Sequence, residues 1–301
     1  MHLTKVSFLF FLLLGFFSCF SDEKKTKGNE DTINSGTINV SVDETLQPLM
    51  LAEFNVYAFQ NQNAKLNVTF KPEREVFDDF KNDSARAIIV TRELTEDEMN
   101  YFKSIQYVPR SMPFAKDAIS FIVNKNNPCD SFTLDELIKT IKGQSTTNSV
   151  IVFDNNGSST LRWLKDSLLK KDALSKNCFA LQNNPEVIKY VSENEKAIGI
   201  IGNSWISNLN DSLVIKRLHT IKRVKIAAIN SRDFLEPYQS EIATNSYPLA
   251  RMVYCIQRDG KVGLGTGLQR FLYDETGQLI ALKFGLMPFR QPERSLHFNE
   301  Q

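Results

Sequence analysis

One segment, residues 150–169, constrains the fold of this 301-residue chain more than any other. It begins with the apolar run 150–153, which is typical of a strand buried on both faces of a parallel sheet. The polar residues 154–159 follow, and Leu161 and Leu164 then recur at helical spacing. The segment therefore predicts a strand, a tight polar turn and a helix, the repeating unit of an α/β protein.

The polar turn after this strand has the residue types that bind oxyanions. Its hydroxyl side chains are Ser158, Ser159 and Thr160, directly at the predicted start of the helix. The first N–H groups of a helix have no partner inside the helix, and the helix dipole adds roughly half a positive charge there. These donors together predict an oxyanion site. A serine-capped helix that binds nothing is the alternative.

Strands and helices alternate along the rest of the chain. Apolar and alternating runs predict strands at 38–42, 66–70, 87–90, 118–123, 197–201, 224–229, 251–256 and 278–284. Helices are expected at 46–57, 76–80 and 267–273, after the capping boxes Thr95–Glu98 and Thr133–Glu136, and after Asn184, the expected N-cap before Pro185. This alternation predicts an α/β fold with largely parallel sheets.

The N-terminus has the features of an export signal. Lys5 precedes the apolar run 6–17, which is short for a membrane span, and Ser18-Cys19 follows it. A small residue before a cysteine at this place resembles a bacterial lipoprotein signal, which implies cleavage before Cys19 and acylation of its thiol. An ordinary secretory signal with an incidental cysteine is the alternative. The polar residues 20–36 are typical of a flexible tether.

Charge and cysteine content exclude several classes of protein. The net charge is +1, and a chain without an excess of basic residues gives no indication of a nucleic-acid partner. Cys129, Cys178 and Cys255 remain after the signal, and this odd number implies no closed disulfide framework. A Cys129–Cys178 bridge and three buried thiols are the two alternatives. The spacing of cysteine and histidine does not fit a metal site, and we expect neither a metal nor a cofactor.

Seven motifs along the chain resemble phosphate ABC-transporter substrate-binding proteins, in the order in which that family has them. They are Thr45-Leu46 in a first ligand loop, the 88–98 strand and helix start, the 113–128 crossing segment, the 157–160 Gly-Ser-Ser-Thr loop, the 197–202 Ala-Ile-Gly-Ile-Ile-Gly strand, and the closing segments 246–251 and 277–280. The resemblance covers residues from about 36 to 288.

This resemblance implies a periplasmic-binding-protein fold, with two mixed, largely parallel sheets in two α/β lobes and a ligand cleft between them. Lobe one would comprise 36–115 and 225–301, and lobe two 116–224. The family's function is to bind a solute and deliver it to an ABC permease, so we expect a lipid-anchored, periplasm-facing protein of the bacterial envelope. We further expect a monomer that is not an enzyme, because no nucleophile–base pair is evident.

The resemblance also implies the residues that hold the anion. They are Thr45, Leu46, Thr91 and Arg92 on lobe one, and Ser158, Ser159 and Thr160 on lobe two; Asp154 and Arg162 flank the latter loop. The sequence departs from the family twice. Residues 71–74 replace a Gly-Ser loop, and Asp154 stands where the family tends to have arginine, with Arg162 after the loop instead.

Asp154 has three expected roles. It could cap the helix, form an ion pair with Arg162 or Arg92, or accept a hydrogen bond from a protonated phosphate oxygen. The two departures leave two functional hypotheses. The first is capture of phosphate or a similar oxyanion for an ABC importer, and the second is an anion-sensing or scaffold lipoprotein that keeps the fold without transport.

Overall fold

The computed structural model describes residues 31–145, 149–170 and 172–291. The predicted signal, Cys19 and most of the tether lie outside these residues. Its strands are β1 (Gly36–Asp43), β2 (Ala64–Lys71), β3 (Ala87–Val90), β4 (Arg110–Asn124), β5 (Ser131–Thr133), β6 (Val150–Phe153), β7 (Cys178–Ala180), β8 (Ala197–Gly202), β9 (Ile221–Arg223), β10 (Lys225–Ala227), β11 (Ala250–Gln257) and β12 (Met287–Pro288).

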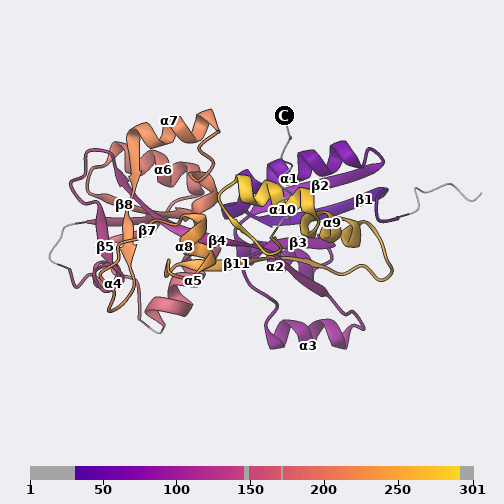
Figure 1. Cartoon of the computed structure of the whole chain (residues 1–301). Helices are drawn as coiled ribbons and strands as arrows, with labels where there is room; N and C mark the ends of the chain where they lie inside the picture. Colours follow the sequence, from indigo (N-terminus) through magenta and orange to yellow (C-terminus); the bar gives the residue numbers. More distant parts are fainter. Residues whose placement is uncertain (1–30, 146–148, 171, 292–301) are drawn as a thin grey trace, which may run out of the picture. The chain divides into compact units, whose positions relative to one another are not determined.

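Ten α-helices are present in the described part of the chain (Figure 1). They are α1 (Gln47–Gln60), α2 (Glu73–Lys81), α3 (Glu96–Ser104), α4 (Leu134–Ile141), α5 (Ser159–Leu164), α6 (Asn184–Glu193), α7 (Ser212–Thr220), α8 (Gln239–Ala243), α9 (Leu264–Tyr273) and α10 (Glu275–Lys283). A 3₁₀ turn, Glu44–Leu46, precedes α1, and a π-helical turn, Lys165–Leu169, extends α5.

The strands form one mixed sheet and a separate two-stranded sheet of β10 and β5. The main sheet has the order β2-β1-β3-β11-β4-β8-β6-β7, and β9 and β12 pair with β4. Five strand pairs are parallel and five are antiparallel. The α/β class and the mixed sheet are thus confirmed, but the largely parallel pairing was wrong, because the long strands β4 and β11 run against their neighbours.

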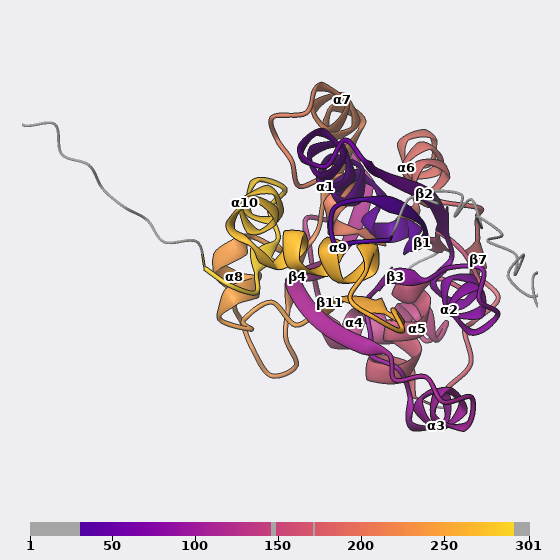
Figure 2. The same cartoon turned by 90° about the vertical axis from the view of Figure 1, so that its right-hand side faces the viewer.

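The short strand β3 shows why the sheet is covered on both faces. Ala87 and Ile89 pack into a core with α1 and α9, whereas Ile88 and Val90 pack into a second core with α2 and α3. Successive side chains of a strand point to opposite faces, so an uninterrupted apolar run is stable only between two layers of helices. Figure 2 shows α1 and α9 on one side of β1 and β3, and α2 on the other.

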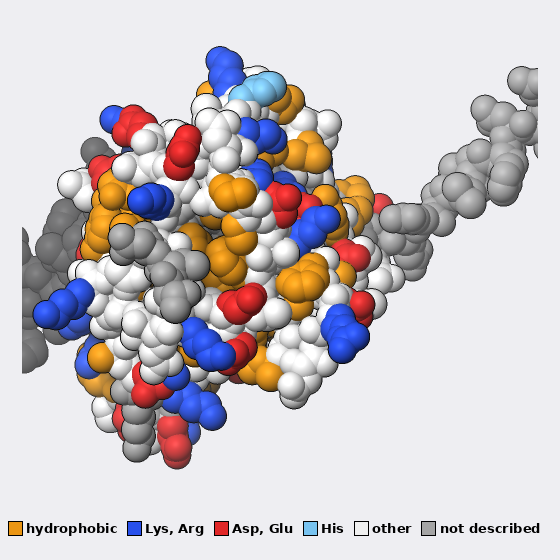
Figure 3. All heavy atoms as spheres, turned by 90° about the vertical axis from the view of Figure 1, so that its left-hand side faces the viewer, with side chains coloured by type: hydrophobic (Ala, Val, Ile, Leu, Met, Phe, Trp, Pro, Cys, Tyr) orange, Lys and Arg blue, Asp and Glu red, His pale blue; other side chains and the backbone are white. Residues whose placement is uncertain are grey.

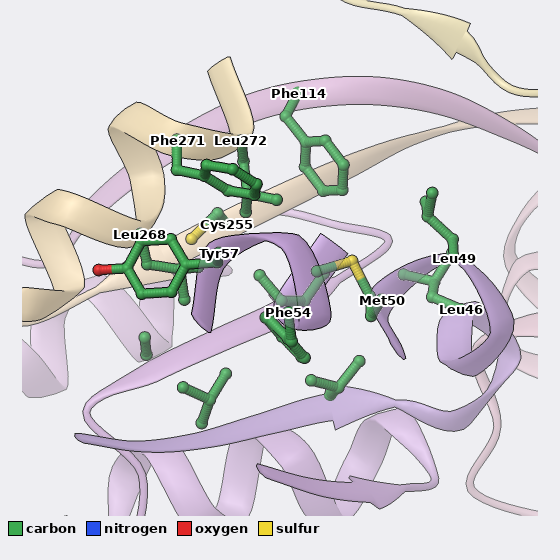
Figure 4. Packing of buried hydrophobic residues seen from close by; sticks show 14 of the residues in the cluster. Leu46, Leu49, Met50, Phe54, Tyr57, Phe114, Cys255, Leu268, Phe271 and Leu272 are labelled. Carbon is green, nitrogen blue, oxygen red and sulfur yellow. The ribbon is translucent and has the colours of Figure 1, made fainter. Parts of the chain in front are cut away.

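The first core is built on the apolar face of α1 (Figure 4). Leu46, Leu49, Met50, Phe54 and Tyr57 are buried along it, at the spacing of three or four residues that one helix face requires. They meet side chains from β4, β11 and α9: Phe114, Cys255, Leu268, Phe271 and Leu272. The rings of Tyr57 and Phe271 meet edge to face at 5.2 Å.

A different set of cores surrounds β6 and β8. Ile151 and Phe153 face one core together with Ile198 and Ile200, and Val152 faces another core with Ile201. The apolar run 150–153 is therefore buried on both faces, as predicted. Gly199 lies where the sheet meets α6, and a Cβ there would come within 2.8 Å of Val187 and Val191.

Most of the local predictions are confirmed. Both capping boxes form, with Thr95 and Thr133 as the N-caps of α3 and α4. The N-cap of α6 is Asn183 rather than Asn184, since Asn183 accepts the hydrogen bond from the N–H of Glu186. Asn184 is thereby left to bond elsewhere, at the site described below.

Of two strand predictions in the C-terminal third, one was too long and the other was wrong. The region 224–229 contains a strand, but only the short β10, and Ile226 also bridges to Leu235. Residues 278–284 fall in helix α10, which packs Ala281 into the first core. A short apolar run does not separate strand from helix. Here Gly277 lets α10 approach α9, because a Cβ would come within 2.5 Å of the carbonyl of Phe271.

The described end of the predicted tether, residues 31–36, makes contacts with the fold. The carboxylate of Asp31 accepts a hydrogen bond from the N–H of Leu264 at 3.1 Å and pairs with Arg86 at 2.7 Å. Residues 31–36 are therefore attached to the fold by their own contacts. Within the described residues, no helix is both long enough and apolar enough to cross a membrane.

The described cysteines are unpaired, and one face of the molecule has charges of both signs. Cys129, Cys178 and Cys255 are free thiols, so the Cys129–Cys178 bridge is not formed; only Cys255 is fully buried. On the face in Figure 3, the described Lys and Arg side chains alternate with Asp and Glu rather than gathering in one basic patch.

Glu53 in α1 gives the fold a pH dependence. Both of its carboxylate oxygens are buried without a hydrogen-bond partner among the described residues, and burial raises its pKa to about 9. The folded state therefore holds a proton that the unfolded state releases above about pH 4.5, so Glu53 lowers the unfolding free energy progressively as the pH rises to about 9.

We expect Glu53→Met to raise the unfolding free energy by about 1–3 kcal/mol near pH 5, where it removes a buried unpaired carboxyl group, and by several kcal/mol more near pH 9, where folding must also keep that group protonated. Denaturant unfolding at the two pH values measures this. The exposed Glu75 of α2 supplies the control Glu75→Met. Equal effects of Glu53→Met at both pH values would contradict the assignment.

Candidate functional site

The turn between β6 and α5 forms a closed hydrogen-bond network. Ser158 is the N-cap of α5, and its Oγ accepts from the N–H of Leu161 at 3.2 Å. The hydroxyls of Ser158 and Thr160 lie 2.8 Å apart, and Thr160 donates to Asp154 Oδ1 at 2.6 Å. One of the helix N–H groups expected to face an anion is thus capped by the chain itself.

Asp154 takes neither of two expected roles, the helix cap and the ion pair; its third expected role, toward a protonated phosphate oxygen, stays a prediction. It accepts hydrogen bonds from the side chains of Thr160 and Asn184, the latter at 3.2 Å to Oδ2. It forms no ion pair with Arg162 or Arg92, which pair with other residues, and the N-cap is Ser158. Burial raises its pKa above the usual value.

Arg251 connects two of the predicted anion-binding residues. Its Nη2 donates to Thr45 Oγ1 at 2.9 Å and its Nη1 to Ser159 Oγ at 2.8 Å, and the two hydroxyls lie 3.2 Å apart. Asp117 holds the guanidinium in place, with its Oδ2 at 3.2 Å from Nε and 2.9 Å from Nη2. Both Arg251 and Asp117 are buried.

Sequence reasoning missed Arg251 as a site residue. The available signal was that it ends the segment 246–251, one of the family-like motifs. Its position opposite Asp117 in the β11–β4 register could not be derived from spacing.

A second arginine cluster forms around Glu73, the first residue of α2. Glu73 Oε1 accepts from the N–H of Thr91 at 2.9 Å and from its hydroxyl at 2.8 Å. Arg162 donates through Nε to Oε2 at 2.5 Å and through Nη2 to Thr91 Oγ1 at 3.0 Å. The segment that replaces the family's Gly-Ser loop therefore contributes a buried acceptor instead of donors.

Arg92 and Leu46 lie outside these clusters, and the backbone of Thr45 is also occupied. Arg92 forms a bidentate pair with Glu98, at 2.7 and 2.9 Å, and its guanidinium lies 3.5 Å from the ring centroid of Phe77. The side chain of Leu46 is buried in the first core. The N–H of Thr45, an expected anion donor, bonds to Asp43 Oδ1 at 3.1 Å.

Two cavities adjoin the clusters, and Ser158 lines both. The first cavity has a volume of about 340 Å³, and its lining combines the cations Arg74, Arg92, Arg162 and Lys165 with the carboxyl groups of Glu73, Asp78, Glu98 and Asp166. The acidic cavity has a volume of about 580 Å³; its lining includes Asp43, Glu44, Lys71, Asp154, Ser158 and Trp205.

The carboxyl groups of the acidic cavity are strongly perturbed. Burial, followed by the charge of Glu73, raises the pKa of Asp43 to about 7. Burial, followed by the charge of Asp154, raises the pKa of Glu44 to about 8. Among the described residues, no group of three or more His, Cys, Asp or Glu side chains is arranged to hold a metal ion.

A family model described as the PBP superfamily domain matches residues 27–275, well over half of the chain. The chain belongs to the PBP superfamily. Among curated relatives, the phosphate-binding protein PstS of Pseudomonas aeruginosa is 23% identical over 225 residues, and Protein SphX of Synechococcus elongatus is 24% identical over 234 residues. The alignments cover 66% and 71% of this chain, but just under two thirds, 66%, of each relative.

Solved structures agree with this membership. A phosphate ABC-transporter substrate-binding protein with bound phosphate from Clostridium perfringens has a TM-score of 0.72 at 19% identity, covering 85% of this chain and all of the other. An ABC-type phosphate transport receptor from Vibrio cholerae has a TM-score of 0.62 at 18% identity, covering 83% and 99%. These likenesses confirm a PBP-type α/β fold.

The Arg251–Asp117 pair leads to a stability prediction. We expect Arg251→Met to lower the unfolding free energy by about 3–5 kcal/mol, because Asp117 would remain buried without its charge partner. The double variant Arg251→Met/Asp117→Leu removes both charges and should recover most of this loss. Urea unfolding of the three proteins tests it. A single variant as stable as the wild type would contradict the pairing.

Proposed function

We propose that this chain is a lipid-anchored solute-binding protein that captures phosphate or a similar oxyanion and passes it to an ABC importer. The observation that carries the proposal is the set of donors around Glu73. Two groups of Thr91 and two nitrogens of Arg162 converge on this one carboxylate. Charge-assisted donors that bind a carboxylate oxygen in this way can also bind an oxygen of phosphate or sulfate.

Arg251 supplies the second half of the proposed oxyanion site. Its guanidinium and the hydroxyls of Thr45 and Ser159 form a buried group of donors from three distant segments. In this proposal Thr91, Arg162, Ser158 and Thr160 complete the site, while Arg92 and Leu46 support it from outside. The bound anion would take hydrogen bonds that Glu73 now accepts.

The proposed site lies between two lobes. We assign 36–115 to lobe one and the residues from 116 to lobe two. The separation of the cores near Ala115 and Ala118 supports this boundary. Ile242 and Leu249 pack into the same core as Ala118. This packing favours a C-terminal boundary of lobe two at about residue 250 instead of 224, with lobe one resuming after it. The protein would act as a monomer in the cell envelope, facing the periplasm.

Glu73 also favours a second function. Because its carboxylate occupies donors of the site, the chain would serve as a sensing or scaffold module that keeps the fold without transport. A phosphate dianion beside buried Glu73 and Asp43 would meet like charge, which disfavours binding. The two functions differ in whether the wild-type protein binds phosphate.

Calorimetric titration with phosphate and sulfate tests the proposal. We expect the wild type to bind phosphate and Glu73→Gln to bind it about tenfold more tightly, because the variant keeps the side-chain shape and loses the repelling charge. The exposed Glu75 on the same helix provides the control Glu75→Gln, with unchanged affinity. If only Glu73→Gln binds, the second function holds. If neither protein binds phosphate or sulfate, the oxyanion site is wrong.

The lipid anchor is tested separately. We expect Cys19→Ser to move the protein from the membrane fraction to the soluble fraction, or to leave the signal uncleaved, because a serine hydroxyl does not take the place of the acylated thiol. Cell fractionation and electrophoretic mobility measure this outcome. The variant Cys129→Ser is the matched control. Identical behaviour of Cys19→Ser and the wild type would contradict lipidation.

A further inference from the structure

The acidic cavity lies beside the oxyanion donors but has the opposite charge. Its three carboxylates come from places where strands end: Asp43 ends β1, Glu44 follows it, and Asp154 follows β6. Lys71 is the cation of the described lining, and its Nζ is bound to both oxygens of Asp79 at 3.0 and 2.7 Å. The lining therefore has three carboxyl groups against one cation that is already paired, and Arg251, outside the lining, is the nearby charge that acts on Asp43 and Asp154.

One carboxylate oxygen in this lining has no partner. Asp43 is fully buried; its Oδ1 accepts from the N–H of Thr45, but Oδ2 has no hydrogen-bond partner among the described residues. Trp205, also buried and in the lining, has an unpartnered donor at Nε1, which the oxyanion of a solute, and not its ammonium group, would satisfy. A buried polar atom without a partner costs about 1–3 kcal/mol, so such atoms around a cavity indicate that a ligand supplies the missing bonds.

The other two carboxylates are held in position. Asn184, the residue displaced from its expected N-cap role, donates to both: its N–H and Nδ2 reach Glu44 at 3.2 and 2.5 Å, and Nδ2 reaches Asp154 at 3.2 Å. Neutral amide donors orient the carboxylates but do not cancel their charge. The described residues provide no metal-ligand group here, which favours an organic cation over a metal ion.

We propose that the acidic cavity is a subsite for a primary ammonium group, so that the solute is an amine that also carries an oxyanion, such as a phosphorylated amine. The oxyanion half of this inference rests on the proposed function. An ammonium group has three donors and a full positive charge, which match the free oxygen of Asp43 and the carboxylates of Glu44 and Asp154.

The two subsites are close enough for one small solute. Asp43 bonds to the N–H of Thr45, whose hydroxyl contacts Arg251, and Ser158 lines both cavities. The volume of about 580 Å³ accommodates more than an inorganic anion. The raised pKa values of Asp43 and Glu44 agree with carboxyl groups that lack a cation in this structure.

Calorimetric titrations of the purified chain test the inference with four probes. They are O-phosphoethanolamine, 2-hydroxyethyl phosphate, inorganic phosphate and ethanolamine. We expect O-phosphoethanolamine to bind at least about tenfold more tightly than 2-hydroxyethyl phosphate, from which it differs chiefly by the ammonium group. Equal affinities would overturn the ammonium subsite and leave the proposed function intact. Binding of ethanolamine without any phosphate binding would support the subsite and contradict the oxyanion function. Binding of none of the probes overturns both.

Two variants test whether the carboxyl groups of the acidic cavity cause the difference in affinity between the two phosphate esters. Glu44→Gln should remove most of the difference between the two phosphate esters, because the amide keeps a similar shape but not the charge. Asp154→Asn should act in the same direction, and Glu75→Gln, outside both cavities, should keep the wild-type ratio. Thermal unfolding checks that each variant is folded. A ratio that is unchanged in both folded variants would remove these carboxylates from recognition.

Discussion

The buried pair of Arg251 and Asp117 is the interaction on which the site depends. The two residues face each other in the antiparallel register of β11 and β4, the strands at the centre of the main sheet. The same guanidinium reaches Thr45, which follows β1, and Ser159, which follows β6, so it joins the two halves of the strand order. One buried cation thus holds two hydroxyl side chains in position and bonds across the β11–β4 pair. Replacing such a pair with apolar residues would preserve packing but lose this directional bonding.

The site is unusual in how many carboxylates accompany its donors. Glu73 accepts bonds from Thr91 and Arg162, Asp43 from the N–H of Thr45, and Asp154 from Thr160. A site meant only for a dianion would be expected to present donors without adjacent acids, because like charges repel strongly at low dielectric. The arrangement fits a protonated oxyanion, or a solute with a cationic group of its own. Membership of the PBP superfamily alone does not decide between them.

The sequence predicted the local structure because its signals act over a few residues. The capping boxes at Thr95 and Thr133, and the apolar run at 150–153, each need only neighbours within one turn or one strand. The same logic failed at 278–284, where a short apolar run is compatible with strand or helix. Packing of Ala281 against the first core, allowed by the close approach at Gly277, decided for the helix.

The sequence by itself determined the α/β class, the polar turn after β6 and the family resemblance. It also indicated Thr45, Thr91, Ser158 and Ser159 as neighbours, and tertiary structure alone decided what surrounds them. Arg251 is 206 positions from Thr45, and Glu73 is 89 positions from Arg162. No propensity or spacing rule acts over such separations. They are set by strand order and register, which depend on the packing of the whole core.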